Sequence, residues 1–333
     1  MDDRAGMIFP WQTAQWQQFS HAKQTRRLAH AYLLTGIYGL GKLKFAIEAA
    51  HLLLCPNEGC QDALCHTRRF ITANKTHSNL CWIEPEEAGH AIKVDQIRAL
   101  NEFVQQTSLQ GEYRLVVIQS ANQMNINAAN ALLKTLEEPA PGAILILVCD
   151  EVSHLPATIL SRCQRITFSQ PKREPALAWL KNQLKDQSID ANLLLNLAHG
   201  APLAALEWQQ TNRVLARQEL FELLYALKQR LADPLTAAVK IQAMDSRQFL
   251  DDMLSWIIDL LHLQVGGKPE SIINQNFLSQ LRQVINEIPM MESIHLMSYL
   301  QQVRSQIMSG INLNKQLLIE NILIRWSRAH VSR

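Results

Sequence analysis

A glycine-rich turn followed by a lysine is the first group of residues in this sequence that could do chemistry. Residues 31–35 (Ala-Tyr-Leu-Leu-Thr) read as a buried strand, and the turn after it contains Gly36, Gly39, Gly41 and Lys42. This spacing is typical of a loop whose backbone N–H groups surround a phosphate. The next residue, Leu43, has no side-chain oxygen where such loops hold magnesium with a Ser or Thr. The sequence therefore predicts a phosphate cradle without its metal ligand.

The acidic residues that hydrolysis needs are also missing. Residues 115–118 (Leu-Val-Val-Ile) read as a later strand of the same sheet, after which an NTPase places an Asp for magnesium and a Glu that activates water. Those positions hold Gln119 and Ser120, which are neither carboxylates nor general bases near neutral pH. We therefore expect no intrinsic ATP hydrolysis. Two alternatives stay open for Lys42: nucleotide binding without turnover, or an ordinary solvated lysine in the first turn of a helix.

Three of the six cysteines lie close together after the first predicted helix: Cys55, Cys60 and Cys65, with His66 and His77 nearby. In an intracellular chain such a cluster indicates free thiols or a metal before it indicates disulfides. A structural zinc site usually has its ligands in compact pairs such as Cys-x2-Cys, and this spacing is irregular. Zinc and unliganded loop thiols both stay open. The scattered cysteines are expected to be structural: Cys81, Cys149 and Cys163.

An arginine follows the most distinctive segment of the chain. Residues 128–136 read as an amphipathic helix stopped by Pro139, and a strand at 144–148 and the tripeptide Ser161-Arg162-Cys163 come after it. An arginine at the rim of a nucleotide domain can reach into a neighbour's site and stabilise charge on a γ-phosphate. From spacing alone, an ordinary surface ion pair is the simpler interpretation of Arg162.

The elements that must position these residues change in character near residue 168. Before it, short apolar runs alternate with helical patterns, which predicts an α/β domain with a parallel sheet and crossover helices. The runs lie at 31–34, 80–83, 115–118, 144–148 and 166–168. After it, leucine-rich helical patterns continue to the end. We predict a nucleotide-fold domain at 1–168, a small helical lid domain at 169–209 and an all-α domain at 210–333.

Composition is that of an ordinary globular chain. Hydrophobic residues make up 47% and charged residues 19% of the 333 residues. The net charge of +2 is too small to indicate nucleic-acid binding by itself. No apolar run of about 18 residues occurs, and the N-terminus opens with charges and not with a signal-peptide pattern. The expected location is the cytoplasm, with no membrane contact.

At the residues described above, the chain resembles the clamp-loader subunits of bacterial DNA polymerase III, and among them the delta-prime family. The most specific likeness is the block Asn-Ala-Leu-Leu-Lys-Thr-Leu-Glu-Glu-Pro at 130–139 joined to Ser-Arg-Cys at 161–163. The resemblance as a whole extends from Pro10-Trp11 to the segment 314–320. The resemblance implies an AAA+-like P-loop domain, a helical lid and a helical collar. It also implies a five-subunit ring in which motor subunits bind ATP and delta-prime is a stator without turnover.

The resemblance assigns roles to individual positions. Arg162 is similar to the arginine finger that a subunit presents to the ATP site of the adjacent motor. The phosphate loop would be degenerate, and nucleotide binding is disfavoured. Cys149 stands where motors carry a polar sensor, and the segment 200–203 lacks the arginine that motors place in the lid. Each of these departures points away from hydrolysis.

The family often carries a four-cysteine zinc module after the first helix, where this chain has three cysteines. The resemblance therefore implies a structural zinc whose ligands would be Cys55, Cys60, Cys65 and His66, with His77 as the other fourth ligand. Alternatively, the metal is lost. No other cofactor is expected.

The resemblance also implies the partners. The chain would contact the motor subunit (gamma/tau) and the delta subunit through its collar, and primer-template DNA and the sliding clamp within the loader. The candidates for DNA contact are Lys93, Arg98 and Lys134. The chain would serve the polymerase holoenzyme without polymerase activity of its own. Two alternatives remain: an active motor ATPase of the same family, and a zinc or nucleic-acid binding protein.

Overall fold

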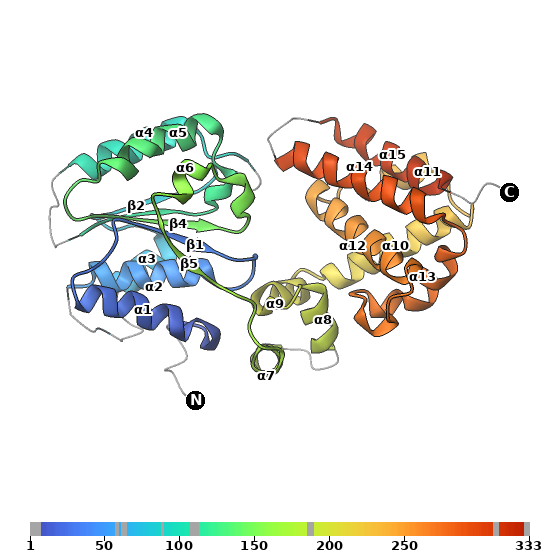
Figure 1. The fold of residues 1–333 in the computed structure, drawn as a ribbon, viewed down its shortest axis with the longest axis horizontal. Helices are drawn as coiled ribbons and strands as arrows, with labels where there is room; N and C mark the ends of the chain where they lie inside the picture. The colour runs from blue at the N-terminus through green and yellow to red at the C-terminus, as the bar shows by residue number, and fades with distance from the viewer. Residues whose placement is uncertain are drawn as a thin grey trace. The chain divides into compact units, whose positions relative to one another are not determined.

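The computed structural model describes residues 8–56, 60, 65–87, 90–106, 113–184, 190–308 and 313–329. The chain forms two compact units, one comprising Met1–Trp179 with Ala201–Ala204 and the other Leu180–Gly200 with Ala205–Arg333. A sheet flanked by helices makes up the first unit, and the second is built from helices (Figure 1). The segment 169–209, expected to form a lid domain of its own, is divided between the two units.

Five parallel strands form the sheet, in the order β2-β3-β4-β1-β5. They are β1 (Ala31–Thr35), β2 (Leu80–Ile83), β3 (Arg114–Ile118), β4 (Ala143–Cys149) and β5 (Gln164–Thr167). The first, third and fourth of these are buried along their whole length, as strands covered on both faces must be. Every strand begins and ends within two residues of the apolar run that predicted it. The predicted α/β domain with a parallel sheet is confirmed.

Helices cover both faces of this sheet (Figure 1). One face carries α1 (Thr13–Gln24), α2 (Lys42–Leu54) and α3 (His66–Asn74), and the other α4 (Val94–Gln105), α5 (Ile126–Glu137) and α6 (Ala157–Leu160). Ile97 of α4 and Leu132 of α5 belong to a core that they share with the buried strands. The side chain of Asn125 caps α5 by accepting the N–H of Ala128, which explains why the helix begins there.

The carboxyl ends of the strands meet at one edge of the sheet, because all five run in the same direction. In the register between β1 and β4, Thr35 lies opposite Cys149. The glycine-rich loop after β1 therefore starts beside Asp150, the residue that follows β4. In open α/β sheets this edge is the usual place for a ligand site.

Three short helices follow the sheet: α7 (Arg173–Gln183), α8 (Ala191–Leu197) and α9 (Pro202–Gln210). The second unit continues with α10 (Arg213–Lys228), α11 (Pro234–Ile241), α12 (Ser246–Gln264), α13 (Leu278–Ile285), α14 (Met290–Met308) and α15 (Lys315–Arg328). Asp233 and Asp245 cap α11 and α12. Phe221 stacks on Phe277 at the centre of the core of this unit.

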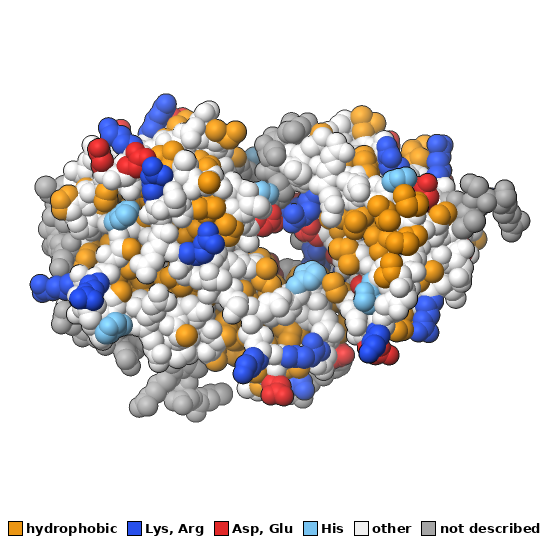
Figure 2. Space-filling model, viewed as in Figure 1, with side chains coloured by type: hydrophobic (Ala, Val, Ile, Leu, Met, Phe, Trp, Pro, Cys, Tyr) orange, Lys and Arg blue, Asp and Glu red, His pale blue; other side chains and the backbone are white. Residues whose placement is uncertain are grey.

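The surface mixes both signs of charge with apolar side chains. Figure 2 shows basic and acidic side chains interspersed on the visible face of both units, and a group of hydrophobic side chains on the second unit. Leu235 and Val239 of α11 and Leu317 of α15 are more than half exposed. Among the described residues, no helix has both the length and the apolar character needed to cross a bilayer.

Candidate functional site

The glycine-rich loop leads from the central strand β1 into the N-terminus of α2. Gly39 and Gly41 have φ angles of 83° and 84°, in the left-handed region that glycine adopts without strain. Gly41 is the N-cap of α2, so Lys42 is the first residue of the helix. The backbone therefore follows the course of a phosphate-binding loop that ends at a helix N-terminus.

The lysine of this loop is buried and fully paired. Only 3% of Lys42 is exposed. Its Nζ lies 2.6 Å from the carbonyl oxygens of Gly36 and Ile37 and 2.6 Å from Oδ1 of Asp150. A lysine ammonium has three N–H donors, and these three contacts use all of them. The charge that would bind phosphate is therefore balanced inside the chain, and Lys42 is not a solvated surface lysine.

Two other segments of the first unit lie against the loop. The N–H of Leu203 donates to the carbonyl oxygen of Gly39 at 3.1 Å, so the segment that lacks the lid arginine contacts the loop directly. The short 3-10 helix η2 (Pro10–Gln12) contacts the next turn of the loop. Two of its side chains donate to the carbonyl oxygen of Leu40, at 3.0 and 2.9 Å: Trp11 and Gln12.

At the positions where hydrolysis would need acidic and polar residues, this chain has side chains of another kind. Oε1 of Gln119, directly after β3, accepts a hydrogen bond from Lys75 at 3.4 Å, and Lys75 also pairs with Glu84. A positive charge beside Gln119 disfavours a divalent cation there. Burial raises the pKa of the Cys149 thiol to about 12, so the residue at the sensor position stays neutral at physiological pH.

Arg162 lies on the surface just after α6 and is held within the chain. Its Nη2 lies 2.6 Å from Oε1 of Glu137, the last residue of α5. Its Nη1 donates to the carbonyl oxygen of Thr158 at 3.0 Å and to Oγ of Ser161 at 3.3 Å. The side chains of Arg162 and Glu137 are 35% and 50% exposed. This ion pair therefore joins the two motifs of the resemblance and leaves the guanidinium open to solvent.

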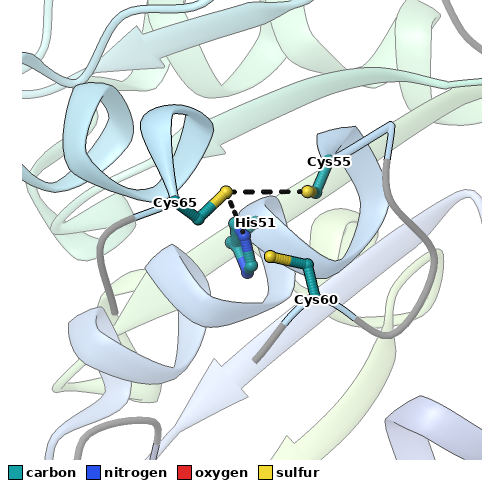
Figure 3. A group of neighbouring side chains, drawn as sticks. All are labelled: His51, Cys55, Cys60 and Cys65. Atoms are coloured by element: carbon teal, nitrogen blue, oxygen red, sulfur yellow. Dashed lines mark hydrogen bonds between the residues drawn. The ribbon is translucent and has the colours of Figure 1, made fainter. Parts of the chain in front are cut away.

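A histidine and three cysteines converge at the junction of α2 and α3 (Figure 3): His51, Cys55, Cys60 and Cys65. One ligand atom from each lies within 4.8 Å of the others. The sulfurs of Cys55 and Cys65 are 3.7 Å apart, and Nε2 of His51 is 3.3 Å from Sγ of Cys65. Sulfurs on a tetrahedral zinc are roughly 3.8 Å apart, because each Zn–S bond is about 2.3 Å. The donor set and its dimensions therefore fit zinc.

The electrostatics of this cluster favour the ligand forms of its members. Burial, with the positive charges of Arg68 and Lys23, lowers the pKa of His51 to about 4, so its imidazole is neutral at physiological pH. Burial raises the pKa of Cys65, but hydrogen bonds from the Arg68 backbone and its neighbours outweigh this effect and leave the pKa below its ordinary value. Cys65 is the N-cap of α3, a position that favours a thiolate.

The histidine in this group is not one that the sequence pattern singled out. His66 is exposed, and its ring lies 4.3 Å from that of Phe70. His77 accepts the backbone N–H of Asn79. The structure thus brings His51, and neither of these, to the three cysteines. The signal that would have found it is its spacing, since residues four apart lie on one side of a helix and His51 precedes Cys55 by four.

The remaining candidates fall into two groups. Burial raises the pKa of Cys81 and of Cys163 to about 11, as expected for structural thiols. Lys93 and Arg98 lie on the surface near the start of α4 and pair with Glu86 and Asp95 at 2.5 and 2.8 Å. Lys134 is an exposed residue of α5.

Two family matches cover most of the chain. The family described as "DNA polymerase III, delta subunit" matches residues 11–172, and "DNA polymerase III, delta subunit, C terminal" matches residues 211–328. A DNA polymerase III subunit delta' of Pseudomonas aeruginosa is 33% identical over 330 residues, which cover 96% of this chain and 97% of the relative. The chain belongs to the delta-prime family of DNA polymerase III clamp-loader subunits. Membership confirms the resemblance carried by residues 130–139 and 161–163.

The chain is also similar to a second delta-prime subunit and to a gamma subunit. The subunit delta' of Bacillus subtilis is 30% identical, over 87% of this chain and 86% of that relative. A DNA polymerase III subunit gamma of Buchnera aphidicola is 31% identical over 168 residues, which cover 50% of this chain and 45% of the relative. The matched segment thus covers about half of this chain and a little less than half of that gamma subunit.

Proposed function

We propose that this chain is a non-hydrolysing stator of the clamp loader. The observation that carries the proposal is the pairing of Lys42, whose three N–H donors are used by Asp150 and by two carbonyl oxygens of the loop. A nucleotide would have to displace Asp150 to reach this ammonium. It would then find Leu43 where a magnesium ligand belongs and Gln119 where the first catalytic acid belongs.

In the same proposal, Arg162 acts in trans on the ATP site of a neighbouring gamma motor. Its guanidinium is partly exposed and fixed by the Glu137 carboxylate and by the Thr158 carbonyl. A pre-positioned guanidinium can stabilise the charge that develops on the transferred phosphoryl group, at little cost in reorganisation. Glu137 would release it, wholly or in part, when the neighbour's phosphate arrives.

The helical unit would hold the chain in the ring, between the gamma motor and the delta subunit. Leu235 and Val239 are one helical turn apart on α11, which packs along α15. Exposed apolar side chains at this spacing suit a helical neighbour. Contact with primer-template DNA would come from the exposed cations Lys93, Arg98 and Lys134, and the assembled ring would load the sliding clamp.

ATP turnover by the reconstituted loader tests the stator and the finger together. We expect the isolated chain to be silent, and Arg162→Ala to lower DNA- and clamp-stimulated turnover by at least roughly ten-fold. Arg165→Ala is the matched control, because Arg165 is an exposed arginine three residues away on β5. Turnover by the chain alone would show an active motor ATPase. Equal turnover with both variants would make Arg162 a structural residue.

We also propose a structural zinc held by His51, Cys55, Cys60 and Cys65. When bound, the ion would tie the end of α2 to the start of α3. Metal analysis of the purified chain should give one zinc per chain. Chains with His51→Ala should bind it more weakly than chains with His66→Ala, which lose an exposed histidine outside the cluster. If His66→Ala weakened zinc binding more than His51→Ala, His66 would be the fourth ligand.

A further inference from the structure

One buried guanidinium nitrogen contacts both His51 and a carboxylate on the same helix. Nη2 of Arg68 lies 3.2 Å from Nδ1 of His51 and 3.2 Å from Oε2 of Glu48. Glu48, His51 and Arg68 are each more than nine-tenths buried. The three side chains thus form a closed group behind the cysteine cluster, away from solvent, on the side of the imidazole opposite Cys65.

The hydrogen-bond roles in this group are fixed by the guanidinium, which can only donate. Nδ1 of His51 must therefore accept from Arg68, and a neutral ring that accepts at Nδ1 carries its proton on Nε2. Nε2 is the atom that faces the sulfur of Cys65. A metal ion among the thiols needs the lone pair of that nitrogen. The arrangement seen in the structure is therefore one that zinc would have to change.

Glu48 can take part in this change. Oε2 of Glu48 is buried and contacts Arg68 as an ion pair, but no group among the described residues makes a well-aligned hydrogen bond to it. Glu48 and His51 are three residues apart on α2, so their side chains leave the same face of the helix. A buried carboxylate oxygen without a well-aligned hydrogen bond is costly to leave in that state, and an Nδ1–H of His51 would supply one.

We propose that Glu48 is the positioning residue of the zinc site: when zinc binds, Nδ1 of His51 exchanges Arg68 for the Glu48 carboxylate. In this exchange one proton leaves Nε2 and one arrives at Nδ1, so the ring stays neutral and only its tautomer changes. Arg68 remains paired with Glu48. Metal-ligating histidines commonly hold their second nitrogen in this way, and the carboxylate fixes the ring and raises its basicity. The inference rests on the proposed zinc site.

A mutant cycle on zinc affinity tests the role of Glu48. Zinc affinity of the full chain is measured by competition with a chromophoric chelator. Glu48→Gln should weaken binding by roughly ten-fold or more, whereas Glu102→Gln, at an exposed carboxylate on α4, should not. In a His51→Cys background the site keeps four ligands but has no imidazole to orient. There Glu48→Gln should change affinity by less than about two-fold, even if the loss of a partner for Arg68 lowers fold stability.

The second measurement is the tautomer of His51. Long-range proton–nitrogen NMR on the same chain shows which ring nitrogen carries the proton. The expected result is a proton on Nε2 in the metal-free chain and on Nδ1 in the zinc-bound chain. An equal loss of affinity from Glu48→Gln in both backgrounds overturns the inference and leaves the zinc site standing, as does an unchanged tautomer. A chain that binds no zinc overturns the zinc site and the inference together.

Discussion

Nζ of Lys42 lies 2.6 Å from Oδ1 of Asp150, so the lysine of the phosphate loop is neutralised by the residue that follows the neighbouring strand. The register that places Thr35 opposite Cys149 brings these two side chains to the same edge of the sheet. In a working NTPase the corresponding lysine binds the β- and γ-phosphates. Here the same side chain is paired with groups of its own chain.

Replacement of Lys42 should therefore affect stability and not catalysis. Lys42→Ala leaves Asp150 and the carbonyl oxygens of Gly36 and Ile37 without their donor, so we expect a loss of about 1–3 kcal/mol in the free energy of unfolding. Urea denaturation measures this loss, with Lys181→Ala on the exposed surface of α7 as control. Loader turnover should stay unchanged wherever the variant is folded. A large loss of turnover would mean that the loop binds nucleotide.

Loss of the Glu137–Arg162 ion pair should cost much less stability than loss of the Lys42 contacts. Both side chains are at least one-third exposed, and surface pairs of this kind contribute only about 0–1 kcal/mol. Glu137→Ala should thus leave stability nearly unchanged and should not lower loader turnover, since the finger remains. Loader turnover with Glu137→Ala and with Arg162→Ala is measured in the same assay. If both variants lower turnover to the same extent, Glu137 is required to aim the arginine.

A methyl group at Gly39 should disrupt the contact between the loop and the start of α9. A Cβ there would lie 2.5 Å from Cβ of Ala204, at a φ of 83°. Gly266 is a matched control because its φ is 82° and nothing lies within 4 Å of its added Cβ. Gly266→Ala should cost about 1 kcal/mol from backbone strain alone, and Gly39→Ala should cost clearly more. Thermal unfolding of the two variants side by side checks this order, and equal costs would contradict the close packing.

Lys228 gives the helical unit a pH dependence. Burial lowers its pKa to about 8, against the opposing charges of Glu287 and Glu292. Between about pH 8 and the ordinary lysine value of 10.5, the unfolded chain binds more protons than the folded one, so stability contributed by this site rises with pH. The difference in free energy of unfolding between wild type and Lys228→Met should therefore grow across this window, by at most about 1.4 kcal/mol per pH unit. A flat difference would mean that Lys228 titrates normally.

The sequence predicted the sheet more accurately than the contacts of the site. Strands such as 144–148 are readable because a parallel strand buried on both faces is a continuous apolar run. The pair between Glu137 and Arg162 joins residues distant in the chain, and no local pattern encodes it. The sequence did not predict that His51 joins the cysteine cluster, because a histidine on the buried side of an apolar helix resembles an ordinary core residue. The use of Asp150 as partner of Lys42 depends on strand register, which the sequence alone does not specify.

The pairing of Lys42 with Asp150 also affects whether the loop would change conformation with nucleotide. A phosphate loop that waits for a ligand has two shapes, and its protein alternates between them as nucleotide comes and goes. In this structure Asp150 of the same chain, and not a bound ligand, is the partner of the loop lysine. As a non-hydrolysing stator, the chain should keep the surroundings of this loop, including η2 and the start of α9, the same at every ATP concentration. A neighbouring motor subunit that changes conformation with each round of ATP turnover would therefore move against a subunit whose own conformation stays constant.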